Sequence, residues 1–233
     1  MATKKTFKFT IDGKACTAKD GQTIVEAARD NKIYIPVLCN FQKLKPAGTC
    51  RICTVKVGGR FMAACTTPVT EGMVVENMTP AIEDMRKEIV EMLFVEGNHM
   101  CPTCEKSGNC ELQALGYRYK MLVPRFPYLW PVRTVIADAP KIYLDRNRCC
   151  QCLRCVRDIK TKDGKHVFGL MERGGKTLIN IDNKLAAKLT EAEAIKAMQQ
   201  CPTGCILRKE IGFKIPIGQR KFDTKPIGSE IEG

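Results

Sequence analysis

Cysteine constrains this chain more than any other residue type. The 233 residues include 14 cysteines, and most of them fall into four groups at residues 39–65, 101–110, 149–155 and 201–205. The first residues lack the apolar core of a signal peptide, and no apolar run reaches the length of a membrane span. We therefore expect a cytoplasmic protein. Clustered cysteines in a reducing compartment favour metal ligation over disulfide bonds.

The charge of the chain allows two explanations. The formal net charge is +13, and basic chains often bind nucleic acid. Thiolate-bound iron–sulfur clusters are anionic, however, so cations around them, together with protein docking, also explain the excess. We favour the second explanation because the sequence has no recognition helix and no RNA-binding aromatic motif. It also lacks a G-x-G-x-x-G motif, a P-loop and a nucleophile–base pair, so we expect no FMN, no NAD and no bond-making chemistry in this chain.

Residues 1–78 are predicted to form a small α+β domain. Two alternating segments meet at Asp12-Gly13, a hairpin turn signal, and two more strands surround Gly58-Gly59. Residues 22–32 are predicted to form a short helix capped by Thr23. Residues 33–38 are expected to run extended into the first cysteine group.

The first cysteine group has the spacing C-x10-C-x2-C-x11-C. A single x2 pair with two distant partners is typical of plant-type [2Fe–2S] ferredoxins, whereas zinc ribbons prefer two such pairs. We predict a [2Fe–2S] site and keep zinc and buried structural cysteines as alternatives. Cys16 lies apart in a strand and is interpreted as a packing residue. The predicted ligands are Cys39, Cys50, Cys53 and Cys65.

Residues 79–139 are predicted to form a second domain with a connector. Thr79-Pro80 is a helix start signal, and the helix should end near Gly97. Residues 121–133 hold three prolines and are expected to form an extended connector packed on a neighbour. The predicted core-facing stripe of the helix is Ile82, Met85, Ile89, Met92 and Leu93.

The second cysteine group is one ligand short of a four-ligand site. Cys101, Cys104 and Cys110 have the spacing C-x2-C-x5-C, and His99 lies two residues before the first of them. The chain has only two histidines, and three cysteines that need a fourth ligand favour the nearer one. We predict that His99 completes a four-ligand metal site with these three cysteines. A water molecule, another residue or a partner subunit is the alternative.

The third and fourth groups are predicted to form one site. Three thiolates spaced C-x2-C-x2-C fit a cubane better than a zinc tetrahedron. Bacterial two-cluster ferredoxins continue with x3-C-P, but Ile159 stands at that position, and a Cys-Pro pair follows only at Cys201. We interpret Cys150 and Cys205 as extra cysteines that do not ligate. The predicted [4Fe–4S] ligands are Cys149, Cys152, Cys155 and Cys201.

Residues 140–215 are predicted to form the last domain. Thr190 and Glu193 form a capping box at the start of a helix. Residues 216–233 spread apolar residues between Gly and Pro, so we expect a loop-like tail. The tail is either a partner-binding arm or a frayed terminus.

The stretch CPTCEKSGNCELQ, residues 101–113, resembles the signature of a [4Fe–4S] domain that is ligated by one histidine and three cysteines. That domain occurs in the large iron–sulfur subunit of complex I and in [FeFe] hydrogenases. In those relatives the histidine generally stands four residues before the first cysteine, where this chain has Gly97. The order of the three sites across residues 5–210 strengthens the resemblance.

A short chain that carries these three motifs is similar to the small (gamma) diaphorase subunit of cytoplasmic NAD-reducing [NiFe] hydrogenases. The tail PIGQRKFDTKPIG also resembles the tail of that subunit. The resemblance implies a β-grasp [2Fe–2S] domain, a helical [4Fe–4S] segment and a ferredoxin-like [4Fe–4S] domain. It also implies single-electron transfer between an FMN- and NAD-binding diaphorase subunit and the small and large hydrogenase subunits. The alternatives are the iron–sulfur subunit of an NAD-dependent formate dehydrogenase or a bifurcating hydrogenase, a zinc-stabilised nucleic-acid-binding protein, and a scaffold without working metal sites.

Overall fold

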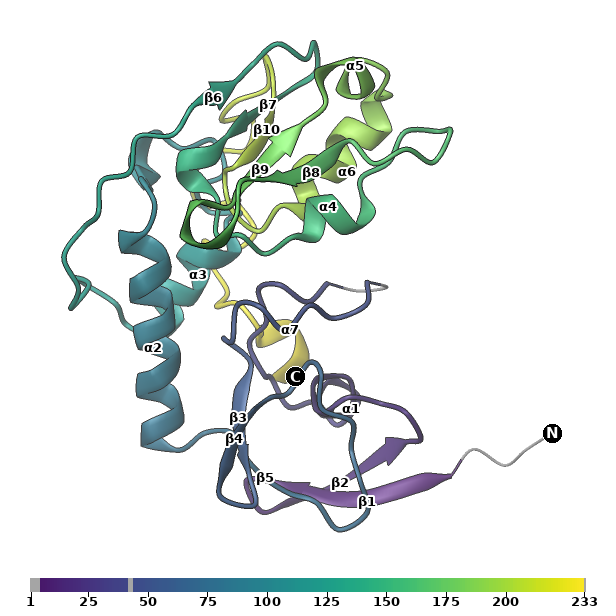
Figure 1. Ribbon diagram of the computed structural model, residues 1–233. Helices are drawn as coiled ribbons and strands as arrows, with labels where there is room; N and C mark the ends of the chain where they lie inside the picture. Colours follow the sequence, from purple (N-terminus) through teal and green to yellow (C-terminus); the bar gives the residue numbers. More distant parts are fainter. Residues whose placement is uncertain (1–4, 42–43, 233) are drawn as a thin grey trace.

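The computed structural model describes residues 5–41 and 44–232. An amino-terminal domain is joined by a long helix, α2 (Pro80–Val95), to a carboxy-terminal domain, and α3 (Glu111–Arg118) lies between the two (Figure 1). Both domains combine helices with sheets. Among the described residues, no helix is both long and apolar enough to cross a membrane.

The amino-terminal domain is a five-stranded sheet with α1 (Ile24–Asp30) packed against it. The strand order is β2-β1-β5-β3-β4, with β1 and β5 parallel and the other neighbours antiparallel. Both predicted hairpins and the predicted Thr23 cap are confirmed. The strands are β1 (Thr6–Ile11), β2 (Lys14–Lys19), β3 (Thr54–Val57), β4 (Arg60–Ala63) and β5 (Val74–Glu76).

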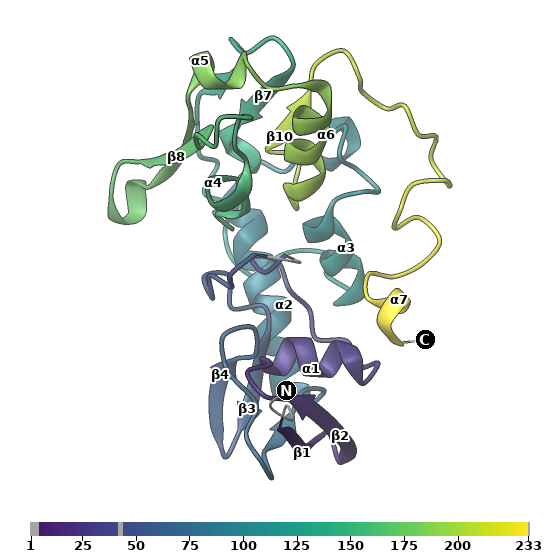
Figure 2. The same cartoon turned by 90° about the vertical axis from the view of Figure 1, so that its right-hand side faces the viewer.

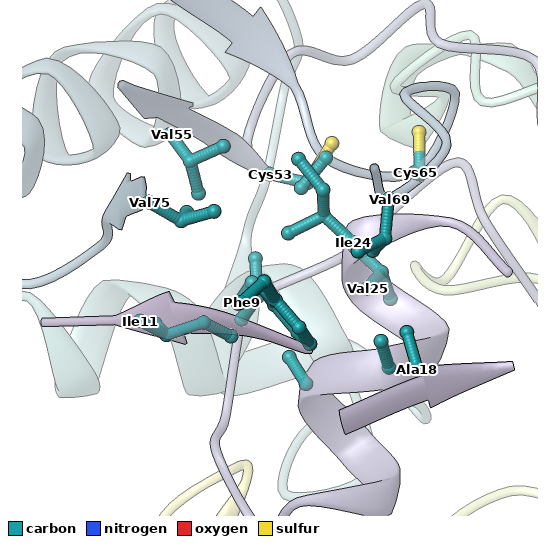
Figure 3. Packing of buried hydrophobic residues seen from close by; sticks show 14 of the residues in the cluster. Phe9, Ile11, Ala18, Ile24, Val25, Cys53, Val55, Cys65, Val69 and Val75 are labelled. Atoms are coloured by element: carbon teal, nitrogen blue, oxygen red, sulfur yellow. The ribbon is translucent and has the colours of Figure 1, made fainter. Parts of the chain in front are cut away.

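The core of this domain lies between the sheet and α1. Figure 3 shows Phe9 and Ile11 of β1 facing Ile24 of α1, with the sulfur atoms of Cys53 and Cys65 at one end of the core. Cys16 is buried in the same cluster, as expected for a packing residue. The apolar core therefore holds two of the predicted ligands in fixed positions at its edge.

The helix α2 begins and ends as predicted. The Thr79 side chain accepts a hydrogen bond from the backbone N–H of Ile82, Pro80 occupies the first turn, and the helix ends at Val95. The predicted apolar stripe is wrong in part, because Met92 is exposed whereas Arg86 and Glu91 are buried.

Buried polar contacts explain this shift of the buried face. Arg86 donates to the carbonyls of Thr54 and Asn77, at 2.9 and 3.0 Å, and so fixes α2 to the amino-terminal domain. Glu91 accepts a 2.7 Å hydrogen bond from Arg125 of the connector. Buried polar groups are stable only with such partners, and apolar periodicity does not reveal them.

The connector at residues 121–133 is irregular, as predicted. Its backbone is attached to the end of α2, since the N–H of Leu129 donates to the carbonyl of Val95 at 3.0 Å. Met121 packs against the core of this chain, but the expectation that the connector packs on a neighbour is wrong within this chain for most of its other apolar side chains. Leu122 and Val132 are 94% and 100% exposed, and Trp130 is 63% exposed.

The carboxy-terminal domain contains a three-stranded sheet, a separate hairpin and three helices. The sheet order is β10-β7-β6, and β8 pairs with β9. The predicted capping box of Thr190 and Glu193 is confirmed at the start of α6. The elements are β6 (Val135–Ile136), β7 (Ile142–Asp145), α4 (Arg154–Asp158), β8 (Phe168–Met171), β9 (Leu178–Ile181), α5 (Asn183–Ala186), α6 (Glu191–Gln200) and β10 (Ile206–Arg208).

The tail is loop-like, as predicted, but it is not a frayed terminus. It leaves the carboxy-terminal domain, passes α3 and ends in the short helix α7 (Ser229–Glu232) (Figure 2). The N–H of Phe222 donates to the carbonyl of Gly108 at 2.8 Å. Arg118 donates to the carbonyl of Ile227 at 2.9 Å, and Ile227 is buried. The tail therefore binds its own chain.

Candidate iron–sulfur sites

The first cysteine group gathers beside the edge of the amino-terminal core. Cys39, Cys53 and Cys65 are buried and Cys50 is half-buried. The neighbouring thiols of Cys50 and Cys65 stabilise the Cys39 thiolate and lower the pKa of Cys39. Hydrogen bonding to Cys65 likewise lowers the pKa of Cys53. The four cysteine side chains thus lie next to one another.

A tight turn positions the two central cysteines of this group. Arg51, between Cys50 and Cys53, has a φ of +58°, and its carbonyl accepts a 2.6 Å hydrogen bond from the Thr54 hydroxyl. Gly48 precedes the turn with a φ of +68°, where an added Cβ would come within 3.1 Å of Thr66. The glycine lets the loop lie close to the Cys65 segment.

The second cysteine group lies between α2 and α3. Cys101 opens a short 3₁₀ turn, and Cys110 caps α3, where its sulfur accepts a hydrogen bond from the N–H of Gln113 at 3.4 Å. Burial raises the pKa of Cys110 to about 12. Arg148, from the carboxy-terminal domain, donates to the sulfur of Cys104 at 3.6 Å. This contact supports the explanation that cations surround the thiolates, although sequence reasoning did not identify the residue.

His99 has the properties of a neutral nitrogen ligand. Its Nε2 atom is buried and has no hydrogen-bond partner among the described residues. Burial lowers the pKa of His99 to about 4, so the imidazole is neutral at neutral pH and keeps a lone pair for a metal. A buried polar atom without a partner is costly unless a ligand meets it. The donor set of one imidazole and three thiols fits a [4Fe–4S] cluster.

The backbone at Gly97 explains why histidine can stand at position 99. A Cβ built on Gly97 would lie 2.6 Å from His99 Nε2 and 2.7 Å from the carbonyl of Asn147. The imidazole therefore fills the space that a side chain at position 97 would enter. The position of the His99 imidazole therefore depends on the absence of a side chain at residue 97.

The third site brings distant segments together. Gln151 and Leu153 have φ values of +50° and +59°, which turn the backbone sharply between Cys149 and α4. Cys152 and Cys155 are buried, and Cys201 is buried at the end of α6, which packs against α4. The structure therefore brings Cys201 to the same core cluster as Cys155.

The two extra cysteines also lie in this region. The Cys205 thiol lies next to both Cys149 and Cys201 and lowers the pKa of each, that of Cys201 to about 5. Cys150 hydrogen-bonds to Cys152, and that bond together with burial raises the pKa of Cys150. The prediction that neither extra cysteine ligates remains a prediction.

Each site offers backbone donors to its sulfur atoms. The N–H of Cys39 donates to Cys50 Sγ at 3.3 Å, and the N–H of Gln151 donates to Cys149 Sγ at 3.4 Å. A cavity of about 440 Å³ is lined by both Cys50 and Cys149, so the first and third sites border the same space. Within residues 5–41 and 44–232, no three Cys, His, Asp or Glu side chains converge on the position of a single metal ion.

Three family models match the chain in succession. A 2Fe-2S iron–sulfur cluster binding domain matches residues 4–80. The iron–sulfur binding region of NADH-ubiquinone oxidoreductase-G matches residues 86–125. The ferredoxin-like domain of NADH-quinone oxidoreductase subunit 3 matches residues 139–207.

Whole-chain relatives match over the same length. The gamma subunit of the NAD-reducing hydrogenase HoxS of Cupriavidus necator is 47% identical, over 94% of each chain. A chain of a crystal structure of NAD+-reducing [NiFe]-hydrogenase in the H2-reduced state has a TM-score of 0.87 and 37% identity, again over 94% of each chain. The mitochondrial 78 kDa subunit of NADH-ubiquinone oxidoreductase of Candida albicans is 32% identical over 89% of this chain, but the match spans only 29% of that larger protein.

Proposed function

Because this chain belongs to the family of the gamma subunit of NAD-reducing hydrogenase, we propose that it is the electron-transfer subunit of a multisubunit H2:NAD+ oxidoreductase. The observation that carries the proposal is that the whole chain, rather than one domain, matches both the gamma subunit and the solved hydrogenase chain. The three candidate sites supply the donor sets that such a relay needs. The formate dehydrogenase and nucleic-acid alternatives have no comparable support.

We assign the clusters to the residues predicted from the sequence. Residues 1–78 form a β-grasp [2Fe–2S] ferredoxin domain, residues 79–139 hold a [4Fe–4S] cluster, residues 140–215 form a ferredoxin-like [4Fe–4S] domain, and 216–233 form the tail. The connected thiols of the first group, the unpartnered Nε2 of His99 and the joined core of Cys155 and Cys201 support this assignment. The ligand sets are Cys39, Cys50, Cys53 and Cys65; His99, Cys101, Cys104 and Cys110; and Cys149, Cys152, Cys155 and Cys201.

The protein's own contribution is to bind the clusters, to bury them and to set their charge environment. When bound, the clusters supply one-electron redox chemistry. Backbone N–H groups donate to Cys50, Cys110 and Cys149, and hydrogen bonds to ligand sulfur stabilise added negative charge. The neutral imidazole of His99 leaves its site one charge less negative than a fourth thiolate would. We therefore expect a higher reduction potential at that site.

The partners follow from the same family. We propose that a diaphorase subunit carries FMN and binds NAD(H), and that small and large hydrogenase subunits carry the [NiFe] centre. This chain contributes no bond-making site, and the assembly is cytoplasmic. The relay then passes single electrons between the flavin and the hydrogenase module.

Anaerobic purification of the tagged native complex tests the function. We expect nickel and FMN to co-purify with this chain, and we expect both H2 and NADH to bleach its visible absorption. The physical reason is that the clusters of this chain lie between the flavin and the [NiFe] centre, so electrons from either NADH or H2 can reduce them. Bleaching by NADH alone, with molybdenum or tungsten in place of nickel, would contradict the hydrogenase assignment and favour a formate dehydrogenase.

A further inference from the structure

A buried arginine lies where the three proposed sites meet. Arg154 is 1% exposed. Its guanidinium donates to both carboxylate oxygens of Glu111, at 2.7 and 2.9 Å, and to the carbonyls of Asn40 and Gln200, at 3.0 and 3.3 Å. The plane of the guanidinium also lies near the ring of Phe41, 5.0 Å from its centroid. The Arg154 side chain therefore contacts segments of all three proposed cluster sites.

Every residue that hydrogen-bonds in this contact set is a sequence neighbour of a proposed cluster ligand. Asn40 belongs to the first site, Glu111 to the second, and Arg154 and Gln200 to the third. The contacts to Asn40 and Glu111 span 114 and 43 residues of sequence, so the arginine ties together loops that the chain does not join locally. The adjacent pairs are Cys39 with Asn40, Cys110 with Glu111, Arg154 with Cys155, and Gln200 with Cys201.

Two neighbouring arginines, Arg157 and Arg148, each contact fewer of the proposed sites than Arg154 does. Arg157 donates to the carbonyls of Cys39 and Cys152, and so connects the first and third sites without reaching the second. Arg148 reaches the second site through Cys104 from its place beside Cys149, and does not touch the first. Of these three arginines, only Arg154 contacts segments of all three sites.

The charge of Arg154 is balanced at the same place. Its partner Glu111 has a side chain that is only 18% exposed. The fixed, planar fork of arginine suits a two-point contact with a carboxylate, which a lysine cannot reproduce. Charges in such a shielded place act over longer distances than charges in water, because solvent screens them less. Removing one member of the pair would therefore leave a charge that all three sites experience.

We propose that the Arg154–Glu111 ion pair is a shared positioning element of the electron relay. It holds the three ligand loops in register, and Glu111 balances the positive charge of Arg154 where these loops meet. The inference rests on the proposed function, because it concerns clusters bound at the assigned residues. Arg154 and Glu111 act through the ligand loops and their charge, and neither is a cluster ligand.

Glu111→Gln tests the electrostatic part. The variant keeps the side-chain shape and an acceptor oxygen for Arg154 but leaves its positive charge unbalanced. Redox titrations of the complex, followed by EPR, should show more than one cluster becoming easier to reduce. We expect about a tenfold rise in the reduced-to-oxidised ratio at a fixed potential, equivalent to about 59 mV for a one-electron centre. Glu191→Gln is the matched control, because Glu191 also pairs with an arginine, Arg208, but on the outer end of α6.

Arg154→Lys tests the positioning part. It keeps the charge but loses the fork, so the potentials should move little while the magnetic interaction between reduced clusters changes in the EPR spectrum. The inference is overturned if all clusters form but Glu111→Gln shifts no potential more than Glu191→Gln does. It is also overturned if Arg154→Lys leaves the cluster–cluster interaction unchanged. A wild-type chain without clusters would instead contradict the proposed function.

Discussion

Cys201→Ala should remove one whole [4Fe–4S] cluster from the protein, about four iron atoms per chain, whereas Cys205→Ala should leave the iron content unchanged. Both cysteines are buried, and Cys205 lies within hydrogen-bonding reach of Cys149 and Cys201. The two differ in their backbone positions. Cys201 follows the last residue of α6, while Cys205 directly precedes β10 and its carbonyl accepts a 2.8 Å hydrogen bond from Asp145 of β7.

The Cys201-Pro202 pair is the reason for the expected asymmetry, because the cysteine that precedes proline is a cluster ligand in bacterial ferredoxins. Cys205 is fixed to the sheet through Asp145, whereas Cys201 lies at a helix end. Iron and acid-labile sulfide analysis of the two variants, with EPR of the reduced proteins, measures the difference. Loss of the cluster in Cys205→Ala with its retention in Cys201→Ala would reverse the assignment of these two cysteines.

His99→Cys should lower the reduction potential of the second cluster by on the order of 100 mV, because a thiolate replaces a neutral imidazole. The other clusters should keep their potentials. Redox titration monitored by EPR separates the three signals. His166→Ala is the matched control, since the other histidine of the chain lies at a bridge with Lys160 in the carboxy-terminal domain.

Gly97→Ala gives an independent test of the same ligand. The added Cβ would lie 2.6 Å from His99 Nε2 and 2.7 Å from the carbonyl of Asn147, so both the imidazole and the backbone before Cys149 must shift although no ligand type has changed. We expect the EPR signal of the second cluster to change in this variant as well. If His99→Cys and Gly97→Ala both left the potential and spectrum of that cluster untouched, a different fourth ligand would be required.

The elements that the sequence predicted correctly have local signals. The Asp12-Gly13 hairpin, the Thr79-Pro80 helix start and the capping box at Thr190 each depend on residues close together in sequence. Strand β5 (Val74–Glu76) has only three residues, and it pairs with β1, more than 60 positions away in sequence. Nothing in so short a segment reveals that partner.

The errors on α2 and the connector also have a physical cause. Apolar periodicity placed Met92 inside, but the buried positions Arg86 and Glu91 are polar and depend on partners from other segments. Apolar side chains of the connector, such as Trp130, remain exposed although the backbone is attached to α2. Periodicity records which residues are apolar and not which polar groups will find partners.

For the candidate sites, the sequence was enough to propose the ligands but not the contacts that surround them. Cysteine spacing was enough to propose the ligand groups, and the shortage of a fourth cysteine pointed to His99. The role of Gly97 as the space for the imidazole needed the structure. The contacts of Arg154 could not be foreseen either, because its partners Asn40 and Glu111 lie 114 and 43 positions away.

Iron and acid-labile sulfide content of the anaerobically purified chain tests the central claim most directly. Three clusters on the assigned ligands predict about ten iron atoms per chain and a brown protein that bleaches with dithionite. A pale protein with fewer than about six iron atoms per chain, or one that retains zinc instead, would contradict the account.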